Sequence, residues 1–195
     1  MKRFFLIGVI ALSVDLYSSS LADDQIKDAS PDGKFGMLLT AKEEGGVKIQ
    51  LIEVSSRKVV LDLGEIGHFG PHAEDWKILW APDSKHFAFY EPNRRGGDTT
   101  VYFRNESGFG PVSLPQLPSC AVPAQKSGKG TSKYLESNIQ PKEWLKSGAL
   151  VVIDDEGWEL VDGNSRWCTQ TVTIAFDAKH HASVLRVTGK RARHP

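Results

Sequence analysis

The chain has 195 residues, 24 of them basic and 24 acidic, with 40% hydrophobic residues and only two cysteines. That length suffices for one domain with a substantial core and hardly for two. The balanced charge gives no reason to expect nucleic acid or an anionic membrane surface as a partner.

Residues 1–22 have the pattern of a cleavable signal peptide. Lys2 and Arg3 form a short basic start, an apolar run extends from Phe4 to Leu12, and Ala22 follows where a signal peptidase cuts. The run is shorter than the roughly 20 residues that a membrane helix needs, and no later segment is apolar enough to span a bilayer. We therefore expect residues 23–195 to be exported to the periplasm or secreted, without a transmembrane segment.

Short apolar runs between polar turns dominate the rest of the chain, and their period-two alternation predicts β-strands. In residues 35–39, for example, Phe35, Met37 and Leu39 share one face. The pattern predicts strands at 35–39, 47–52 and 59–63 in a first unit (29–63), at 86–90, 99–104 and 109–114 in a second (78–114), and at 149–153, 157–161, 169–176 and 182–188 in a third (143–188). Strands joined by such short turns form antiparallel meanders.

The first two units start with nearly the same turn. Ser30-Pro31-Asp32-Gly33-Lys34 precedes one apolar strand, and Ala81-Pro82-Asp83-Ser84-Lys85 precedes another. Proline presets φ for the first corner of a β-turn, aspartate bonds back to the local backbone, and glycine or serine permits the tight exit. A weaker copy, Trp144-Leu145-Lys146-Ser147-Gly148, keeps a tryptophan before a small polar turn, as Trp80 does in the second unit.

These turns resemble the blade starts of TolB-type β-propellers, a WD-like repeat that carries Trp-Ser-Pro-Asp-Gly-Lys before an apolar strand. Trp80, Pro82, Asp83, Lys85 and Phe87-Ala88-Phe89 match that pattern, and Ser30 to Lys34 match its core. The resemblance covers about half of the chain after residue 22. It implies four-stranded antiparallel blades with an aromatic side chain packed between neighbours.

A propeller ring takes typically four to eight blades of about 40 to 50 residues, whereas this chain holds two clear copies of the motif and one blurred one. We therefore expect an all-β fold of antiparallel, blade-like meanders, packed as an incomplete β-propeller or a sandwich in a single domain of residues 23–195. An open array leaves a sheet face or edge to be covered, so self-association is an open alternative.

Residues 115–142 interrupt the strand pattern. Their prolines and glycines, spaced by polar residues, leave little to bury: Pro115, Pro118, Pro123, Gly128 and Gly130. We expect one long mobile loop here, with a short helix near residues 133–138.

Cys120 and Cys168 are the two cysteines. In an oxidising compartment such a pair is a candidate disulfide, which would stabilise the fold by about 4 kcal/mol on chain-entropy grounds. Two buried free thiols are the alternative, because the spacing in sequence does not give the Cα separation that decides between them.

Three groups of residues are candidates for chemistry. His68 and His72 lie four apart, but the intervening Gly70-Pro71 excludes a helix, so a zinc site would need a loop that presents both. Asp154-Asp155-Glu156 resembles an acidic hairpin tip that could bind Ca²⁺ or act in acid/base catalysis, and His180-His181 resembles a surface turn. A solvated loop or turn explains each group without chemistry, and we expect no cofactor.

Trp158 and Trp167 flank the polar stretch 162–166, which ends in Arg166. Exposed aromatic side chains beside an arginine are typical of protein or glycan contacts. These three residues are therefore the predicted binding residues, and a place in the core is the alternative for the tryptophans.

Catalytic motifs such as Gly-x-Ser-x-Gly and His-Glu-x-x-His are missing from the sequence. Together with the export signal and the repeat, this favours an exported, non-catalytic interaction module that contacts a protein or a cell-envelope component. A secreted hydrolase or metal-dependent enzyme, using His68 and His72 or the acidic tip, is one alternative. An inhibitor of a secreted enzyme is another.

Overall fold

The computed structural model describes residues 24–67, 70–120, 133–159 and 163–193. The predicted signal peptide, residues 1–22, lies outside these ranges. Apart from one short 3₁₀ helix, η1 (Ala73–Asp75), every described element is a β-strand. The prediction of an all-β fold is confirmed.

The strands form three antiparallel meanders of four, numbered here in chain order. Meander 1 contains β1 (Gln25–Lys27), β2 (Phe35–Ala41), β3 (Val47–Glu53) and β4 (Val59–Ile66). Meander 2 contains β5 (Lys77–Trp80), β6 (His86–Asn93), β7 (Gly96–Asn105) and β8 (Gly108–Val112). Meander 3 contains β9 (Lys133–Trp144), β10 (Leu150–Glu159), β11 (Ser165–Phe176) and β12 (Ala182–Arg193).

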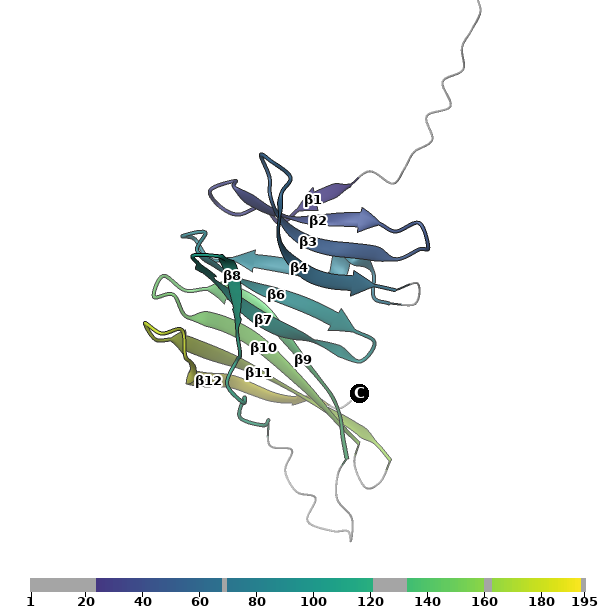
Figure 1. The fold of residues 1–195 in the computed structure, drawn as a ribbon. Coiled ribbons are helices and arrows are strands. Elements are labelled where there is room, and N and C mark those ends of the chain that lie inside the picture. The colour runs from purple at the N-terminus through teal and green to yellow at the C-terminus, as the bar shows by residue number, and fades with distance from the viewer. Residues whose placement is uncertain (1–23, 68–69, 121–132, 160–162, 194–195) are drawn as a thin grey trace, which may run out of the picture.

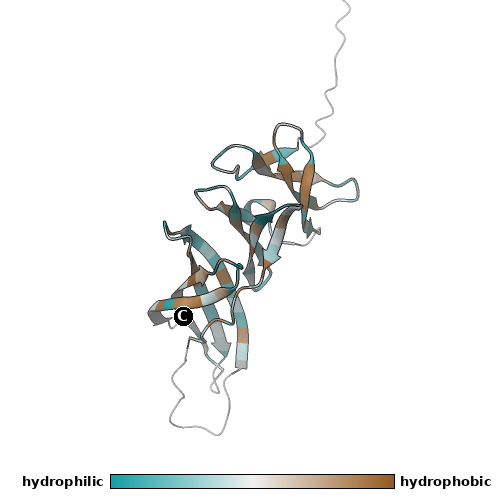
Figure 2. Ribbon diagram, turned by 60° about the vertical axis from the view of Figure 1, so that its left-hand side comes forward, coloured by the Kyte–Doolittle hydropathy of each residue, from teal (hydrophilic) through white to brown (hydrophobic). Residues whose placement is uncertain are grey.

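Hydrogen bonding groups the three meanders into two sheets. Meander 1 is a sheet of its own, while meanders 2 and 3 join in an eight-stranded sheet with the order β12-β11-β10-β9-β7-β6-β5 and β8 paired to β7. The joint is a parallel pairing of Gly97 on β7 with Asn138 on β9. Figure 1 shows the three meanders stacked one above another, and Figure 2 shows the same tiers after a turn of 60°, with hydrophobic residues in each. The fold is an incomplete stack of blade-like meanders, as predicted.

Two hydrophobic cores lie between the tiers, because meander 2 has an apolar face on each side. Phe87 and Phe89 of β6 pack in the core shared with meander 1, and Ala88 between them packs in the core shared with meander 3. The first core buries Phe35, Met37, Leu39, Ile49, Leu51, Leu63, Ile66, Trp76, Ile78, Trp80, Phe87, Phe89 and Phe109. The second buries Ala81, Ala88, Val101, Trp144, Leu150, Val152, Val172 and Ile174. Since a large buried apolar side chain contributes about 1.5–3 kcal/mol, these two cores hold the stack together.

The two matching turns have the same backbone geometry, at the β1–β2 and β5–β6 junctions. In each, the fourth residue donates its N–H to the carbonyl of the first, from Gly33 to Ser30 at 2.8 Å and from Ser84 to Ala81 at 3.0 Å. The aspartate Oδ1 accepts the N–H of the lysine two residues later, at 3.1 Å in the first turn and 2.9 Å in the second. Gly33 and Ser84 both have positive φ, 70° and 58°. The repeated sequence therefore encodes a turn that starts the second strand of a meander.

Two tryptophans connect neighbouring tiers at equivalent points. Trp80 Nε1 donates to the carbonyl of Asp28 in meander 1 at 2.8 Å, and Trp144 Nε1 donates to the carbonyl of Leu79 in meander 2 at 2.9 Å. Each acceptor lies two residues before the first residue of its own turn. Both indoles are largely buried, Trp80 in the first core and Trp144 in the second.

The segment after β8 runs along the second core and ends in a disulfide. Leu114 and Leu117 pack against the core between meanders 2 and 3. Cys120 is bonded to Cys168 of β11, with 5.9 Å between their Cα atoms, which is within the usual range for a disulfide. The predicted bridge is therefore present, and it fastens this segment to meander 3.

Residues 133–142 correct the prediction of a long loop with a short helix. They are not helical but form most of β9, so the predicted loop 115–142 ends before residue 133, and its part 121–132 lies outside the described residues. The strand was not predicted because it contains Pro141, and proline is disfavoured inside a sheet. Pro141 lies where the pairing register with β10 shifts, between Val151 and Val152. Such bulges tolerate proline. Meander 3 thus begins about ten residues before the predicted unit 143–188.

Candidate functional site

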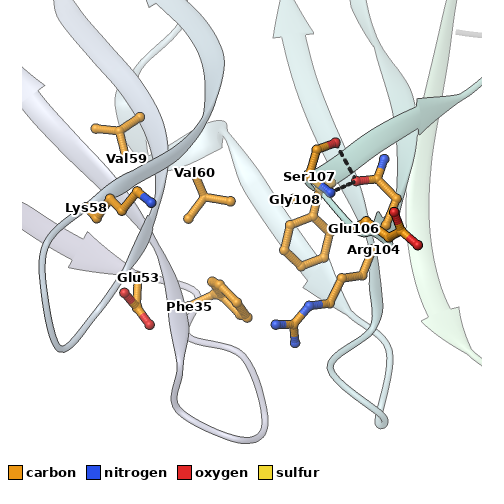
Figure 3. Close-up of a pocket in the computed structure, with 11 residues that line it drawn as sticks. Phe35, Glu53, Lys58, Val59, Val60, Arg104, Glu106, Ser107 and Gly108 are labelled. Atoms are coloured by element: carbon orange, nitrogen blue, oxygen red, sulfur yellow. Dashed lines mark hydrogen bonds between the residues drawn. The ribbon is translucent and has the colours of Figure 1, made fainter.

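A cleft of about 290 Å³ opens between meanders 1 and 2 (Figure 3). One wall comes from the hairpin that joins β3 to β4, through residues 53 and 58–60, and the other comes from the β7–β8 hairpin, through residues 104–109. The two hairpins are about 50 residues apart in sequence and are brought together by the core between the meanders.

The floor of this cleft is aromatic and continuous with the first core. Phe35 and Phe109 pack edge to face with ring centroids 5.3 Å apart, and both also contact Trp80. Val60 packs against the same core, while its neighbour Val59 keeps 45% of its surface exposed. The cleft therefore offers an incoming side chain an apolar surface that is already fixed by the core.

Two cationic side chains reach into the cleft from opposite walls, Lys58 from the β3–β4 hairpin and Arg104 from the β7–β8 hairpin (Figure 3). The Arg104 guanidinium lies over the ring of Phe35, 5.2 Å from its centroid. Within the described part of the chain, neither cation forms an ion pair with a carboxylate. The cleft thus combines an apolar floor with two positive charges that are available to a ligand.

A second cavity, of about 420 Å³, lies between meanders 2 and 3 and is acidic. Its lining includes Asp98, Asp154 and Glu156 beside Tyr134 and Ile139. Burial raises the pKa of the Asp154 carboxyl; the hydrogen bond from Gln170 Nε2, at 2.8 Å, opposes that shift, and the negative charges of Glu156 and Asp155 add to it.

The Asp154-Asp155-Glu156 sequence is not a hairpin tip, which corrects that prediction. It lies within β10, a single strand from Leu150 to Glu159, and the alternation of Leu150 and Val152 toward the core continues through Asp154 and Glu156. Glu156 Oε2 accepts hydrogen bonds from Ser119 Oγ at 3.0 Å and from the N–H of Cys120 at 3.1 Å. This carboxylate therefore anchors the segment that leads to the disulfide.

A third cavity, of about 250 Å³, lies between the turns that start the second strands of meanders 2 and 3. His86 lines it, stacked on Phe103 with ring centroids 4.8 Å apart and packed edge-on to Trp144. Burial lowers the pKa of His86, and nearby His180 lowers it further, while the Asp83 carboxylate, 3.3 Å from His86 Nδ1, raises it. This cavity places an imidazole with a lowered pKa against the second core.

The three predicted binding residues do not form one surface. Trp158 pairs with Arg166 across β10 and β11, whereas Trp167 pairs with Gly157. Successive residues of a strand point to opposite faces, so Trp158 lies on the face of Glu156, to which its Nε1 donates at 3.3 Å, and Trp167 covers Gly157 on the other face. Both indoles are half-buried. The prediction grouped the three residues because they are close in sequence, whereas the strand register places Trp158 and Trp167 on opposite faces of the sheet.

The predicted histidine sites are placed only in part. His68 lies outside the described residues, and His72 is an exposed residue just before η1. The described ranges contain no group of three or more His, Cys, Asp or Glu residues arranged to hold a metal ion. His180 and His181 lie in a turn whose N–H groups bond to Asp177, which agrees with the predicted surface turn.

Sequence reasoning missed Phe35, Lys58, Arg104 and Phe109 as partners in one cleft. The alternation pattern does place Phe35 and Phe109 in strands, but which strands face each other depends on the stacking of the meanders. A basic residue beside each of two hairpin turns was the available signal, and it is too common to single out a site.

No protein-family model matches this chain, and no curated protein matches it in sequence. In the part of the chain that the structure describes, no helix is long and apolar enough to cross a membrane. The disulfide is compatible with a periplasmic or extracellular protein.

Proposed function

We propose that this protein is an exported, non-catalytic interaction module whose stacked meanders contact a protein or a component of the cell envelope. The observation that carries the proposal is the cleft between meanders 1 and 2, with its apolar floor and its two cations that form no ion pair with a carboxylate of the described residues. Aromatic residues with a neighbouring arginine, held in place before binding, are the usual centre of a protein interface.

Export is the second part of the proposal and rests on the pattern of residues 1–22, with the disulfide as support. It is tested by fractionating cells that produce the full chain and reading the N-terminal sequence of the product. We expect a periplasmic or extracellular protein that starts at residue 23. A cytoplasmic protein that retains residues 1–22 would refute export.

The resemblance of the blade-start turns to TolB-type propellers supports the proposal as an analogy between folds, which says little about the partner. The stack of four-stranded meanders fits that analogy, and its open ends leave room for contacts that a closed ring would bury. Self-association is one form that such a contact could take.

The interaction itself is tested by photocrosslinking from inside and outside the cleft. A photoreactive residue replaces Val59, which lines the cleft, or Leu185 of β12, which is 67% exposed and remote from the cleft in meander 3. The exported protein is irradiated in the periplasm or medium of the producing organism. We expect one discrete crosslinked product from position 59 and none from position 185; no product from position 59, or the same products from both, would contradict an interaction through the cleft.

A further inference from the structure

We propose that the cleft between meanders 1 and 2 docks a short acidic segment of a partner protein, in which one apolar side chain is flanked by carboxylates. The apolar side chain enters between the hairpins and the carboxylates pair with Lys58 and Arg104. This inference rests on the proposed function and names the kind of partner that the cleft takes.

The cleft is of a size to take a single side chain rather than a larger ligand. Its volume, about 290 Å³, is just below the roughly 300–1,000 Å³ of small-molecule pockets. Phe35, Val60 and Phe109 supply its apolar surface, and all three belong to or pack against the first core. A single aromatic or branched aliphatic side chain can cover this floor while the peptide backbone stays in solvent.

The charges around the cleft select an acidic segment. Lys58 and Arg104 point toward each other's wall across the opening in Figure 3, while the carboxylate of Glu106 is directed away from it. The other lining carboxylate, Glu53, accepts a hydrogen bond from Ser56 Oγ at 2.6 Å. An incoming carboxylate therefore meets two cations that no carboxylate of the described chain neutralises by direct contact, and each can form a charge-assisted hydrogen bond.

The wall formed by the β7–β8 hairpin, which carries Arg104, is ordered before any ligand binds. The guanidinium of Arg104 lies over Phe35, and Asn105 Oδ1 accepts both the N–H of Ser107 at 3.0 Å and its Oγ–H at 2.9 Å. These contacts hold the β7–β8 hairpin in one shape, so binding orders fewer side chains than it would on a loose loop.

The test is a peptide titration of residues 23–195, followed by the backbone amide signals in nuclear magnetic resonance spectra. The probe is Gly-Ser-Glu-Phe-Glu-Gly-Ser, blocked at both ends. One matched peptide replaces both glutamates by glutamine, and a second replaces the phenylalanine by alanine. The protein variants are Lys58→Gln and Arg104→Gln, with Lys179→Gln in the exposed turn of meander 3 as the control; thermal melts show that each variant is folded.

We expect the acidic probe to shift the amide signals of residues 58–60 and 104–109. We expect both matched peptides to bind at least about fivefold more weakly, and each cleft variant to weaken binding of the acidic probe about threefold to fivefold, as for an exposed ion pair. Lys179→Gln should bind as the unchanged protein does.

Equal binding of the acidic and glutamine peptides, or shifts elsewhere in the protein, would overturn the inference. So would binding that survives both cleft substitutions in folded protein. If crosslinking at position 59 captures a partner while the peptides show no preference for acid, the acidic-segment inference fails and the proposed function stands. If the peptides bind as expected but no partner is captured, the chemistry of the cleft stands and the proposed function fails.

Discussion

The indole Nε1–H groups of Trp80 and Trp144 each donate a hydrogen bond to a backbone carbonyl of the preceding tier, at 2.8 and 2.9 Å. The two acceptors, Asp28 and Leu79, are equivalent positions of successive meanders, so the repeat extends from turn chemistry to the contact between tiers. Ala29 stands where meanders 2 and 3 have these tryptophans. Meander 1 therefore carries no equivalent indole donor, which fits its place at the end of the stack.

Replacing Trp144 by phenylalanine keeps a buried aromatic ring but leaves the Leu79 carbonyl without this donor. A hydrogen bond of this kind contributes about 0.5–1.5 kcal/mol, and the smaller ring adds a packing loss. We expect the free energy of unfolding in urea to fall by about 1–3 kcal/mol. Trp158→Phe is the control, because that indole is half-buried and lies 3.3 Å from its acceptor; equal losses in both variants would contradict the role of the Trp144 bond.

His86 predicts a pH dependence of stability. Its folded pKa lies below the ordinary 6.5 because burial outweighs the opposing charge of Asp83, and His180 lowers the pKa a little further. The unfolded chain therefore binds more protons than the folded chain as the pH falls below about 6.5, so the contribution of His86 to stability is complete above that pH and is lost below it. Between pH 7 and pH 5, His86→Gln should lose less stability in urea unfolding than the unchanged protein does. His72→Gln, at an exposed position, is the control, and identical pH slopes in all three proteins would refute the assignment.

At the scale of elements, the joint between β7 and β9 depends on the close approach of two backbones. A Cβ added at Gly96 would lie 2.0 Å from the carbonyl oxygen of Ser137 on β9, and one at Gly97 would lie 2.4 Å from the Tyr90 hydroxyl. Tyr90 in turn donates to Asn138 Oδ1 at 2.7 Å, and Thr99 Oγ1 donates to the Ile139 carbonyl at 2.6 Å. Gly96 is needed here for space between meanders 2 and 3, and Gly97 makes room for the Tyr90 side chain that reaches Asn138.

Gly96→Ala tests this joint. Because the clash is with backbone rather than with a flexible side chain, β7 and β9 must separate, and we expect a loss of about 1–3 kcal/mol in the free energy of unfolding. Gly67→Ala is the matched control, since a Cβ there meets nothing within 4 Å. A Gly96→Ala protein as stable as the control would show that the parallel pairing does not join the two meanders.

How far the sequence predicts each element depends on how local its determinants are. The turns at residues 30–34 and 81–85 were predictable, because proline, aspartate and a residue with positive φ act within a few residues. The first strand of every meander, β1, β5 and β9, was missed: β1 and β5 are three and four residues long, and β9 is polar with a proline. Their stability comes from pairing with the next strand, which no local pattern expresses.

The described residues form a stack of three tiers, and the clefts arise from the stacking. Phe35 and Phe109, or Lys58 and Arg104, become neighbours only when meander 1 packs on meander 2, so no motif within one meander could predict the candidate site. A disulfide fastens the segment after β8 to meander 3. It joins Cys120 and Cys168, which are 48 residues apart in sequence.

Removing the disulfide should loosen the segment that closes the second core. For a loop of this length the chain-entropy model gives about 4 kcal/mol of stabilisation. We expect the double variant Cys120→Ser, Cys168→Ser to lose about 2–4 kcal/mol in urea unfolding, and a reducing agent to destabilise the unchanged protein similarly without affecting the variant. A midpoint that neither treatment moves would mean that the bridge contributes nothing to the fold.

Because the three meanders share two cores, we expect them to unfold as one cooperative stack. Hydrogen exchange of the indole Nε1–H groups, followed by nuclear magnetic resonance, measures this cooperativity, because Trp80 and Trp144 each report on one interface between tiers. We predict that both indoles exchange slowly and at the same rate, which is set by global unfolding. Rapid exchange at Trp144 while Trp80 stays protected would show that meander 3 opens independently, and would contradict a single cooperative stack.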